Sequence, residues 1–246
     1  MLSKLQSTMR FYMLATQLKY KIRTGWDENH WNVNKDRIES IAEHIYGTCI
    51  LAISLHSEFE LDLDIEKVVK MLVLHEIGEV VIGDITPFDN ITPEEKMKRE
   101  HDAILKVLGG MIKRYEYYAL LLEFDAHETK ESIFAYHCDK IDADIQAKVY
   151  LDMGVHRPLG ELTHNVVLKD PKIQQMQKDG ASNAFDFFYA FDKHRYADDE
   201  IFADLLEFVK NTNTQQLLNE SKWLKNWIIK GESRRRQNAF FCFFYC

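Results

Sequence analysis

Apolar residues recur at intervals of three and four along most of the chain, which is the spacing that buries one face of an α-helix. Such patterns predict helices over residues 2–22, 37–58, 65–81, 92–108, 112–124, 128–153, 170–178, 182–191, 198–210 and 214–230. We find no segment with the convincing polar–apolar alternation of a half-buried strand. The sequence therefore predicts an all-α protein, folded as a single compact bundle of helices.

Local signals support the ends of these helices. Thr92, Pro93 and Glu95 are typical of a helix start, because threonine caps the first turn, proline fits the first helical position and glutamate can complete a capping box. Loops are expected over residues 23–36 and 83–90. With only 10 Gly and 4 Pro in 246 residues, the chain has few turn signals, which again favours helices.

The chain length predicts one domain with ample core. We assign residues 1–230 to this helical domain. Residues 231–246 change in character, because three arginines are followed by a cluster of Phe and Cys. We expect this tail to lie outside the domain, as a disordered segment, a partner contact or a sequence appended during cloning, and we predict no function for it.

Composition narrows the classes of function. The formal net charge of −8 argues against general affinity for nucleic acid. The apolar runs are too short to span a membrane, and Lys4, Gln6 and Arg10 interrupt the first segment where a secretory signal would stand. The four cysteines have neither CxxC nor disulfide-framework spacing, which suits a reducing compartment. These features predict a cytoplasmic enzyme with no nucleic-acid or membrane partner.

Acids and histidines on three predicted helices form a combination that suits a metal ion. His44 lies on the second predicted helix, His75 and Glu76 on the third, and Asp139 on the sixth. Two imidazoles and two carboxylates can hold one divalent cation and leave positions open for water and substrate. His75 and Glu76 follow the apolar run VVKMLVL, where buried ionisable groups are costly unless they are paired or bound to metal.

Other acids and histidines near these positions have different interpretations. On a continuous helix Glu79 lies about 40° around the axis from His75, so it can reach the water or substrate beside a metal and pass protons. Asp142 shares a helix face with Asp139, and spacing alone does not decide between the two. His101 stands in the highly charged segment MKREHDAILKV, which we interpret as a solvated face.

A zinc peptidase is an alternative interpretation of His75 and Glu76. Its motif requires a second histidine four residues after the first, so that both imidazoles lie on one face of a helix. Glu79 occupies that position in this chain. The missing imidazole makes this alternative the weaker one.

Residues 10–155 resemble the HD-domain metal-dependent phosphohydrolases, and within them the helical 5′-deoxynucleotidases. The resemblance is carried by RTGW, RIESIAEHIYGT, LHEIGEVVIGDITPFDNITPEEK and CDKIDADIQA, in that order. The resemblance implies that the metal ligands are His44, His75, Glu76 and Asp139. It implies that Glu79 handles the attacking water and that Asp84 lies near the sugar and leaving oxygen. It also implies that Arg23 and Trp26 contact phosphate and nucleoside. A guanidinium fork suits phosphate, whereas a loop tryptophan is more often a packing anchor.

The chain departs from this family at one position, because the second motif is His75–Glu76 where the family has His–Asp. Glutamate is one methylene longer but remains an oxygen ligand. We therefore expect a phosphohydrolase that acts on a small phosphomonoester, with a nucleoside 5′-monophosphate as the expected substrate. Alternatives are a non-catalytic nucleotide or metal sensor, and a phosphodiesterase or hydrolase of signalling nucleotides. The expected cofactor is Mn, Co, Fe or Zn, and a homodimer is one expected form of the protein.

Overall fold

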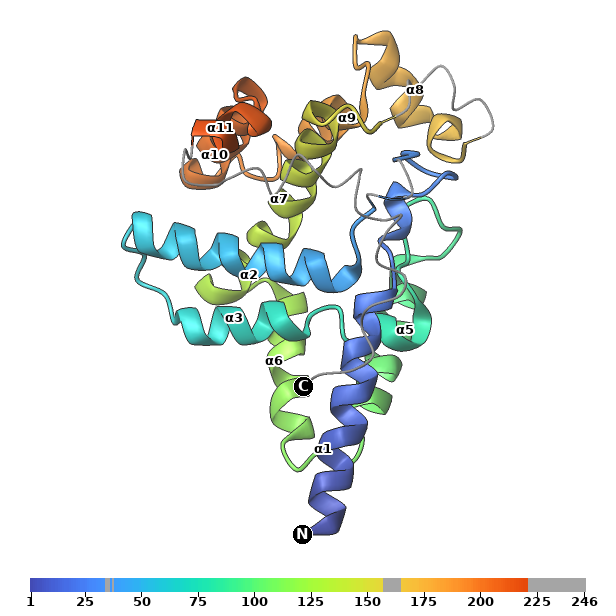
Figure 1. The fold of residues 1–246 in the computed structure, drawn as a ribbon, viewed down its shortest axis with the longest axis vertical. Coiled ribbons are helices and arrows are strands. Elements are labelled where there is room, and N and C mark those ends of the chain that lie inside the picture. Colours follow the sequence, from blue (N-terminus) through green and yellow to red (C-terminus); the bar gives the residue numbers. More distant parts are fainter. Residues whose placement is uncertain (34–35, 37, 157–164, 221–246) are drawn as a thin grey trace, which may run out of the picture.

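Helices account for nearly all of the regular structure in the computed structural model, which describes residues 1–33, 36, 38–156 and 165–220 (Figure 1). They are α1 (Leu2–Ala15), α2 (Ile41–Glu58), α3 (Ile65–Leu74), α4 (Glu79–Ile82), α5 (Pro93–Leu108), α6 (Arg114–Ala126), α7 (Lys130–Asp152), α8 (Pro171–Lys178), α9 (Ala184–Asp192), α10 (Glu200–Asn211) and α11 (Thr214–Glu220). Within the described ranges the β-structure is limited to two isolated bridges, Ile22 with Ser40 and Val33 with His156. The prediction of an all-α bundle is confirmed.

Side-chain caps set the starts of the helices that carry the candidate site. Ser40 accepts a hydrogen bond from the Glu43 N–H while the Glu43 carboxylate accepts one from the Ser40 N–H, so α2 begins at Ile41 rather than at 37. Thr129 caps α7 in the same reciprocal way. Thr92 caps α5 as the sequence predicts. Each cap satisfies backbone donors that a helix start would otherwise leave unpaired.

Two predicted helices are shorter than the apolar pattern suggested. The first ends at Ala15 and continues as a 3₁₀ turn over Thr16–Tyr20. The predicted helix over 65–81 is interrupted after Leu74, where the backbone tightens so that the Ile77 N–H donates to the Leu74 carbonyl, three residues back. The apolar periodicity continues through such a turn, because a 3₁₀ segment changes the angular spacing only slightly over one turn.

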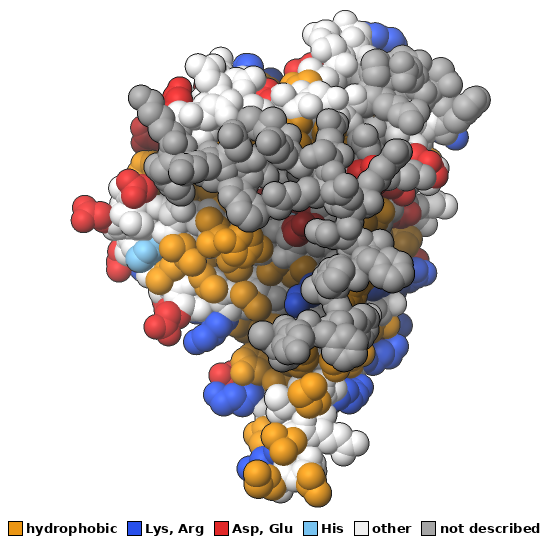
Figure 2. All heavy atoms as spheres, in the orientation of Figure 1, with side chains coloured by type: hydrophobic (Ala, Val, Ile, Leu, Met, Phe, Trp, Pro, Cys, Tyr) orange, Lys and Arg blue, Asp and Glu red, His pale blue; other side chains and the backbone are white. Residues whose placement is uncertain are grey.

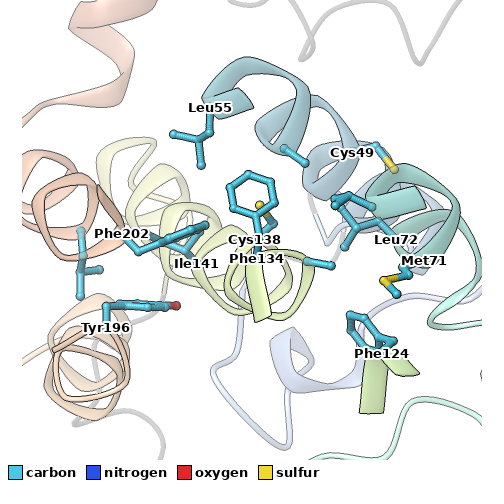
Figure 3. Close-up of a cluster of buried hydrophobic side chains, with 14 residues drawn as sticks. Cys49, Leu55, Met71, Leu72, Phe124, Phe134, Cys138, Ile141, Tyr196 and Phe202 are labelled. Carbon is cyan, nitrogen blue, oxygen red and sulfur yellow. The ribbon is translucent and has the colours of Figure 1, made fainter. Parts of the chain in front are cut away.

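Helix α7 runs through the middle of the molecule and is the support on which the others pack (Figure 1). It contacts α2, α3, α6, α9 and α10. Figure 3 shows Phe134, Cys138 and Ile141 of α7 between side chains of α2, α3 and α10. A fully buried residue such as Ile141 stabilises the fold by about 1.5–3 kcal/mol. This core holds α2, α3 and α7 in the fixed arrangement that the candidate site needs.

A second buried cluster attaches the N-terminal turns to the body of the protein. Trp26 lies edge-on to Tyr150 of α7 and is stacked with Phe188 of α9, with ring centroids 5.3 and 5.2 Å apart. Trp31 is stacked with Phe187 at 5.3 Å. These contacts fix residues 23–33, which the sequence predicts as a loop, beside the ends of α2 and α7.

Helix α1 lies at one edge of the molecule, with its N-terminus pointing away from the body (Figure 1). It carries five exposed apolar residues: Leu2, Leu5, Met9, Tyr12 and Met13. Figure 2 shows hydrophobic side chains in orange at the bottom of the view, where α1 begins in Figure 1. Among the described residues, no helix is long and apolar enough to cross a membrane. The predicted tail over 231–246 and the end of the predicted helix over 214–230 lie outside the described residues.

Candidate metal centre

Four side chains from α2, α7 and the turn after α3 converge on one point. Each of His44, His75, Glu76 and Asp139 offers one donor atom, and these four atoms all lie within 4.8 Å of one another. His44 Nε2 is 3.0 Å from Asp139 Oδ1, and His75 Nε2 is 3.5 Å from the same oxygen. Glu76 Oε1 lies 3.4 Å from His75 Nε2 and 3.8 Å from His44 Nε2. The fold thus brings together all four of the residues that the sequence singled out.

The orientation of His75 fits a cation at this point. Its Nδ1 donates a hydrogen bond to the Leu72 carbonyl oxygen at 2.6 Å, so Nε2 is the nitrogen that faces the cluster. Within the described residues this Nε2 is buried and has no hydrogen-bond partner. A buried polar atom without a partner is rare in proteins because it is costly. Two nitrogen and two carboxylate donors around one point suit a divalent transition metal.

His44 is held from behind by a second carboxylate of α7. Its Nδ1 is 2.8 Å from Asp142 Oδ2, while its Nε2 faces Asp139. A ligating imidazole commonly donates its other N–H to a carboxylate in this way, which fixes the ring and its tautomer. Gly47 makes the approach possible, because a Cβ at this position would overlap the Asp142 carboxylate. The geometry therefore distinguishes Asp139, which faces the cluster, from Asp142, which supports His44.

The cluster is strongly coupled electrostatically. Burial opposes the charged form of His75, but the carboxylates of Glu76 and Asp139 outweigh it and raise the imidazole pKa to about 10. Burial likewise opposes the charged forms of the two acids. The pKa of Asp139 nevertheless lies well below its usual range beside Lys140 and the two histidines, and His75 holds the pKa of Glu76 well below its usual range. Two carboxylates thus stay ionised in a buried position, which is the charge that a bound cation offsets.

Glu79 lies next to the cluster, in the first turn of α4. Burial, together with the negative charges of Glu76 and Asp84, raises the pKa of its carboxyl group to about 11. The angle of 40° that a continuous helix predicts does not apply, because the backbone between His75 and Glu79 is a tight turn in which the Glu79 N–H donates to the Glu76 carbonyl. A cation on Glu76 would oppose the shift by reducing the local negative charge.

Arg23 reaches the edge of the cluster from the N-terminal turn. Its guanidinium lies 3.7 Å from Glu76 Oε1 and 3.6 Å from Glu39 Oε1. Burial would lower the pKa of Arg23, but Glu76, Glu39 and Asp84 raise it above its usual range, so the group stays charged. Its position suits an anion that approaches the metal ligands.

The indole of Trp26 supports Arg23 rather than facing an opening. Trp26 is only 2% exposed, and its Nε1 donates to Glu39 Oε1 at 3.0 Å. Glu39 is also held by the Tyr150 hydroxyl, which lies 2.9 Å from the Glu39 backbone nitrogen. This arrangement favours the packing-anchor interpretation of Trp26, and contact with a nucleoside stays an untested prediction.

Asp84 connects the loop after α4 to the N-terminal turn. Gly83, with φ of 79°, lets the chain leave α4 in a conformation that other residues rarely adopt. Asp84 Oδ2 then accepts a hydrogen bond from the Thr24 N–H at 2.6 Å. Burial raises the pKa of Asp84, as does the charge of Glu76, whereas Arg23 lowers it.

His101, which the sequence predicts on a solvated face, lies away from the cluster. His101 Nε2 is 3.0 Å from Asp125 Oδ2 on the exposed surface between α5 and α6. Sequence reasoning gave no role to Lys140 and Glu39, although both contact the residues of the site. Lys140 directly follows Asp139, so its position along the chain was a usable signal. No comparable signal marked Glu39, because its contacts join segments far apart in the sequence.

The model of the HD domain matches residues 15–185. The chain belongs to the HD domain family. This match includes all four residues of the cluster together with Arg23, Glu79 and Asp84. The resemblance described from the sequence is therefore confirmed at the level of the family.

Curated relatives of the chain carry the name 5′-deoxynucleotidase. Human 5′-deoxynucleotidase HDDC2 is 31% identical over 155 residues, which cover 62% of this chain and 72% of the human protein. The 5′-deoxynucleotidase HDDC2 of Dictyostelium discoideum is 33% identical over 150 residues, which cover 58% of this chain and 76% of that protein.

Solved structures give the same fold. The structure of a predicted metal-dependent phosphohydrolase from Magnetospirillum magnetotacticum MS-1 aligns with a TM-score of 0.51 at 27% identity, over 62% of this chain and 74% of that one. A conserved hypothetical protein from Pyrococcus furiosus aligns with a TM-score of 0.55 at 22% identity, over 83% of this chain and 99% of that one. The second likeness concerns the fold alone.

Proposed function

We propose that this HD domain is a metal-dependent phosphohydrolase that releases phosphate from a nucleoside 5′-monophosphate. The observation that carries the proposal is the convergence of four donor atoms from separate segments, including a buried histidine nitrogen without a hydrogen-bond partner. Relatives named 5′-deoxynucleotidase support the substrate class. In this proposal His44, His75, Glu76 and Asp139 hold the cation.

A divalent cation, when bound, would offset charge on a phosphoryl oxygen and lower the pKa of a nearby water. The mixed nitrogen and oxygen donors suit Mn, Co, Fe or Zn. Glu76 takes the place of the usual aspartate and still offers an oxygen, since its Oε1 lies within reach of both imidazoles.

The remaining residues of the site bind the phosphate and move protons. Arg23 offers N–H donors to the phosphate oxygens, and its charge persists because carboxylates surround it. Glu79 would accept the proton of the attacking water, since a cation held by Glu76 would reduce the negative charge that raises the Glu79 pKa. Asp84, whose pKa is raised by burial, donates a proton to the leaving oxygen.

Trp26 and Glu39 have a positioning role in this proposal. Trp26 holds Glu39, and Glu39 in turn holds the Arg23 guanidinium. Removal of the indole would therefore weaken phosphate binding through Arg23, without requiring contact between the indole and a base.

The test is a screen of phosphate release in which each candidate metal is combined with deoxyribo- and ribonucleoside 5′-monophosphates. Cyclic and dinucleotide substrates are included as the alternative substrate class. We expect release from monophosphates only after metal loading, and none after chelation. Binding of monophosphates without turnover would favour the sensor, and turnover of diesters alone would favour the phosphodiesterase.

A further inference from the structure

Lys140 stands directly beside the candidate metal centre. Its Nζ lies 2.7 Å from Asp139 Oδ2, while the other oxygen of the same carboxylate faces His44 and His75. The Lys140 side chain is 40% exposed and the Asp139 side chain 7% exposed, so the pair lies at the edge of the buried cluster. It also lies over the Tyr136 ring, with Nζ 5.4 Å from the ring centroid.

An ammonium group in this position has donors to spare. It carries three N–H donors, and the contact with Asp139 engages one carboxylate oxygen. The remaining N–H donors can serve a second anion. Lysine is a point charge with rotatable donors, which suits a phosphate that arrives in more than one orientation.

The charge balance of the site calls for a second cation. Six carboxyl groups lie in or beside the cluster: Glu39, Glu76, Glu79, Asp84, Asp139 and Asp142. Arg23 contacts the cluster at Glu76, and Lys140 contacts it at Asp139. A phosphate dianion that enters such an acidic site needs positive charge beyond a divalent metal and one arginine.

We propose that Lys140 is a second phosphate-binding cation, which contacts phosphoryl oxygens from α7 while Arg23 contacts them from the N-terminal turn. This inference rests on the proposed phosphohydrolase function. Lys140 keeps one N–H on Asp139 and directs the others to the phosphate. The alternative is that Lys140 acts only on Asp139 and thereby on the metal.

Equilibrium binding of inorganic phosphate to the metal-loaded protein distinguishes these roles. We compare the wild type with Lys140→Met, which keeps much of the side-chain volume, and with Lys140→Arg, which keeps the charge. Lys130→Met is the matched control, because Lys130 is on the same helix and pairs with Asp62 at 2.9 Å, far from the cluster. Metal content of every variant is measured in parallel by elemental analysis.

We expect Lys140→Met to raise the phosphate dissociation constant about tenfold, which corresponds to about 1.4 kcal/mol and to the loss of one charge-assisted hydrogen bond. Lys140→Arg should recover most of the affinity, Lys130→Met should match the wild type, and metal content should not change. Wild-type phosphate affinity in Lys140→Met would overturn the proposal, as would a loss of bound metal in that variant. Failure of the proposed function would look different, because phosphate would then bind in a Lys140-dependent way while nucleotides release none.

Discussion

Two buried aspartates of α7, five residues apart, have opposite electrostatic behaviour. Asp139 is 5% exposed and Asp144 is 0% exposed, so burial raises the pKa of both. At Asp139 this effect is reversed by Lys140 and the two histidines, so the pKa of Asp139 lies well below the usual range. At Asp144 the carboxyl group of Asp192 adds to the effect of burial, so the pKa of Asp144 lies well above the usual range.

The difference shows that burial of an acid does not by itself make a metal site. Asp144 Oδ2 lies 3.3 Å from the Tyr196 hydroxyl, and its Oδ1 has no hydrogen-bond partner among the described residues. The fold tolerates this buried acid because its carboxyl group is protonated and therefore neutral. Asp139, in contrast, stays ionised among imidazoles whose lone pairs can converge on a cation. What surrounds each acid, rather than its burial, decides its chemistry.

The largest effect is expected from removing one imidazole on the Asp139 side of the comparison. His75→Ala should lower phosphate release to the background rate, a loss on the order of 10³-fold or more, since metal catalysis is worth several kcal/mol. The assay is release of phosphate from a nucleoside 5′-monophosphate after metal loading. His101→Ala is the matched control and should keep wild-type turnover. Substantial activity in His75→Ala would remove this residue from the site.

The next effect separates proton transfer from metal binding. Glu79→Gln keeps the shape of the side chain but cannot accept a proton, so we expect kcat to fall by about 10²–10⁴-fold. Metal content, measured by elemental analysis, should stay at the wild-type level. Near-normal turnover would exclude Glu79 from the mechanism, and loss of metal would make it a ligand.

A smaller effect should follow from disturbing the support of His44. Gly47→Ala places a methyl group where the Asp142 carboxylate lies, so Asp142 must move away from His44 Nδ1. Loss of such a supporting carboxylate typically weakens metal binding about 10–100-fold. Competition with a chelating dye measures the affinity. Unchanged affinity would show that the contact between Asp142 and His44 does not orient the ligand.

The last prediction concerns the Asp144 side and the stability of the protein. Because its folded pKa is raised, the native state binds more protons than the unfolded state above the ordinary aspartate range, and stability falls as pH rises. The charged groups that face it, Asp192 and Arg195, remain in Asp144→Asn. As pH rises, the free energy of unfolding should fall more steeply in the wild type than in this variant. The difference in slope should be up to about 1.4 kcal/mol per pH unit. Urea unfolding between pH 6 and pH 9 measures both slopes, and parallel slopes would contradict the assignment.

Much of the fold could be predicted from local patterns. The cap of α5 depends on residues a few positions apart, and the structure agrees with it. The break after Leu74 could not be predicted, because the apolar pattern of VVKMLVL continues into the turn that follows it. The apolar periodicity also could not predict which helices contact α7, because it concerns each helix by itself.

The candidate site was partly predictable for the same reason. His44, His75, Glu76 and Asp139 stand in ordered motifs, and the fold brings their donor atoms together. The residues that hold the site in place were harder to predict from the sequence, because Glu39 contacts Arg23 and Trp26 only in the folded protein. The burial of Trp26 also depends on Phe188, which is remote in sequence.

The central claim is that the group around Asp139 holds a divalent cation. Elemental analysis of matched variants, Asp139→Asn and Asp144→Asn, tests it most directly after both have been loaded with Mn, Co, Fe or Zn and dialysed. Each substitution replaces a buried aspartate of α7 by its amide, and circular dichroism verifies that both remain folded. We predict about one metal ion per chain in the wild type and in Asp144→Asn, and a substantial loss of metal in Asp139→Asn. Equal occupancy in the two variants, or no bound metal in the wild type, would contradict the account.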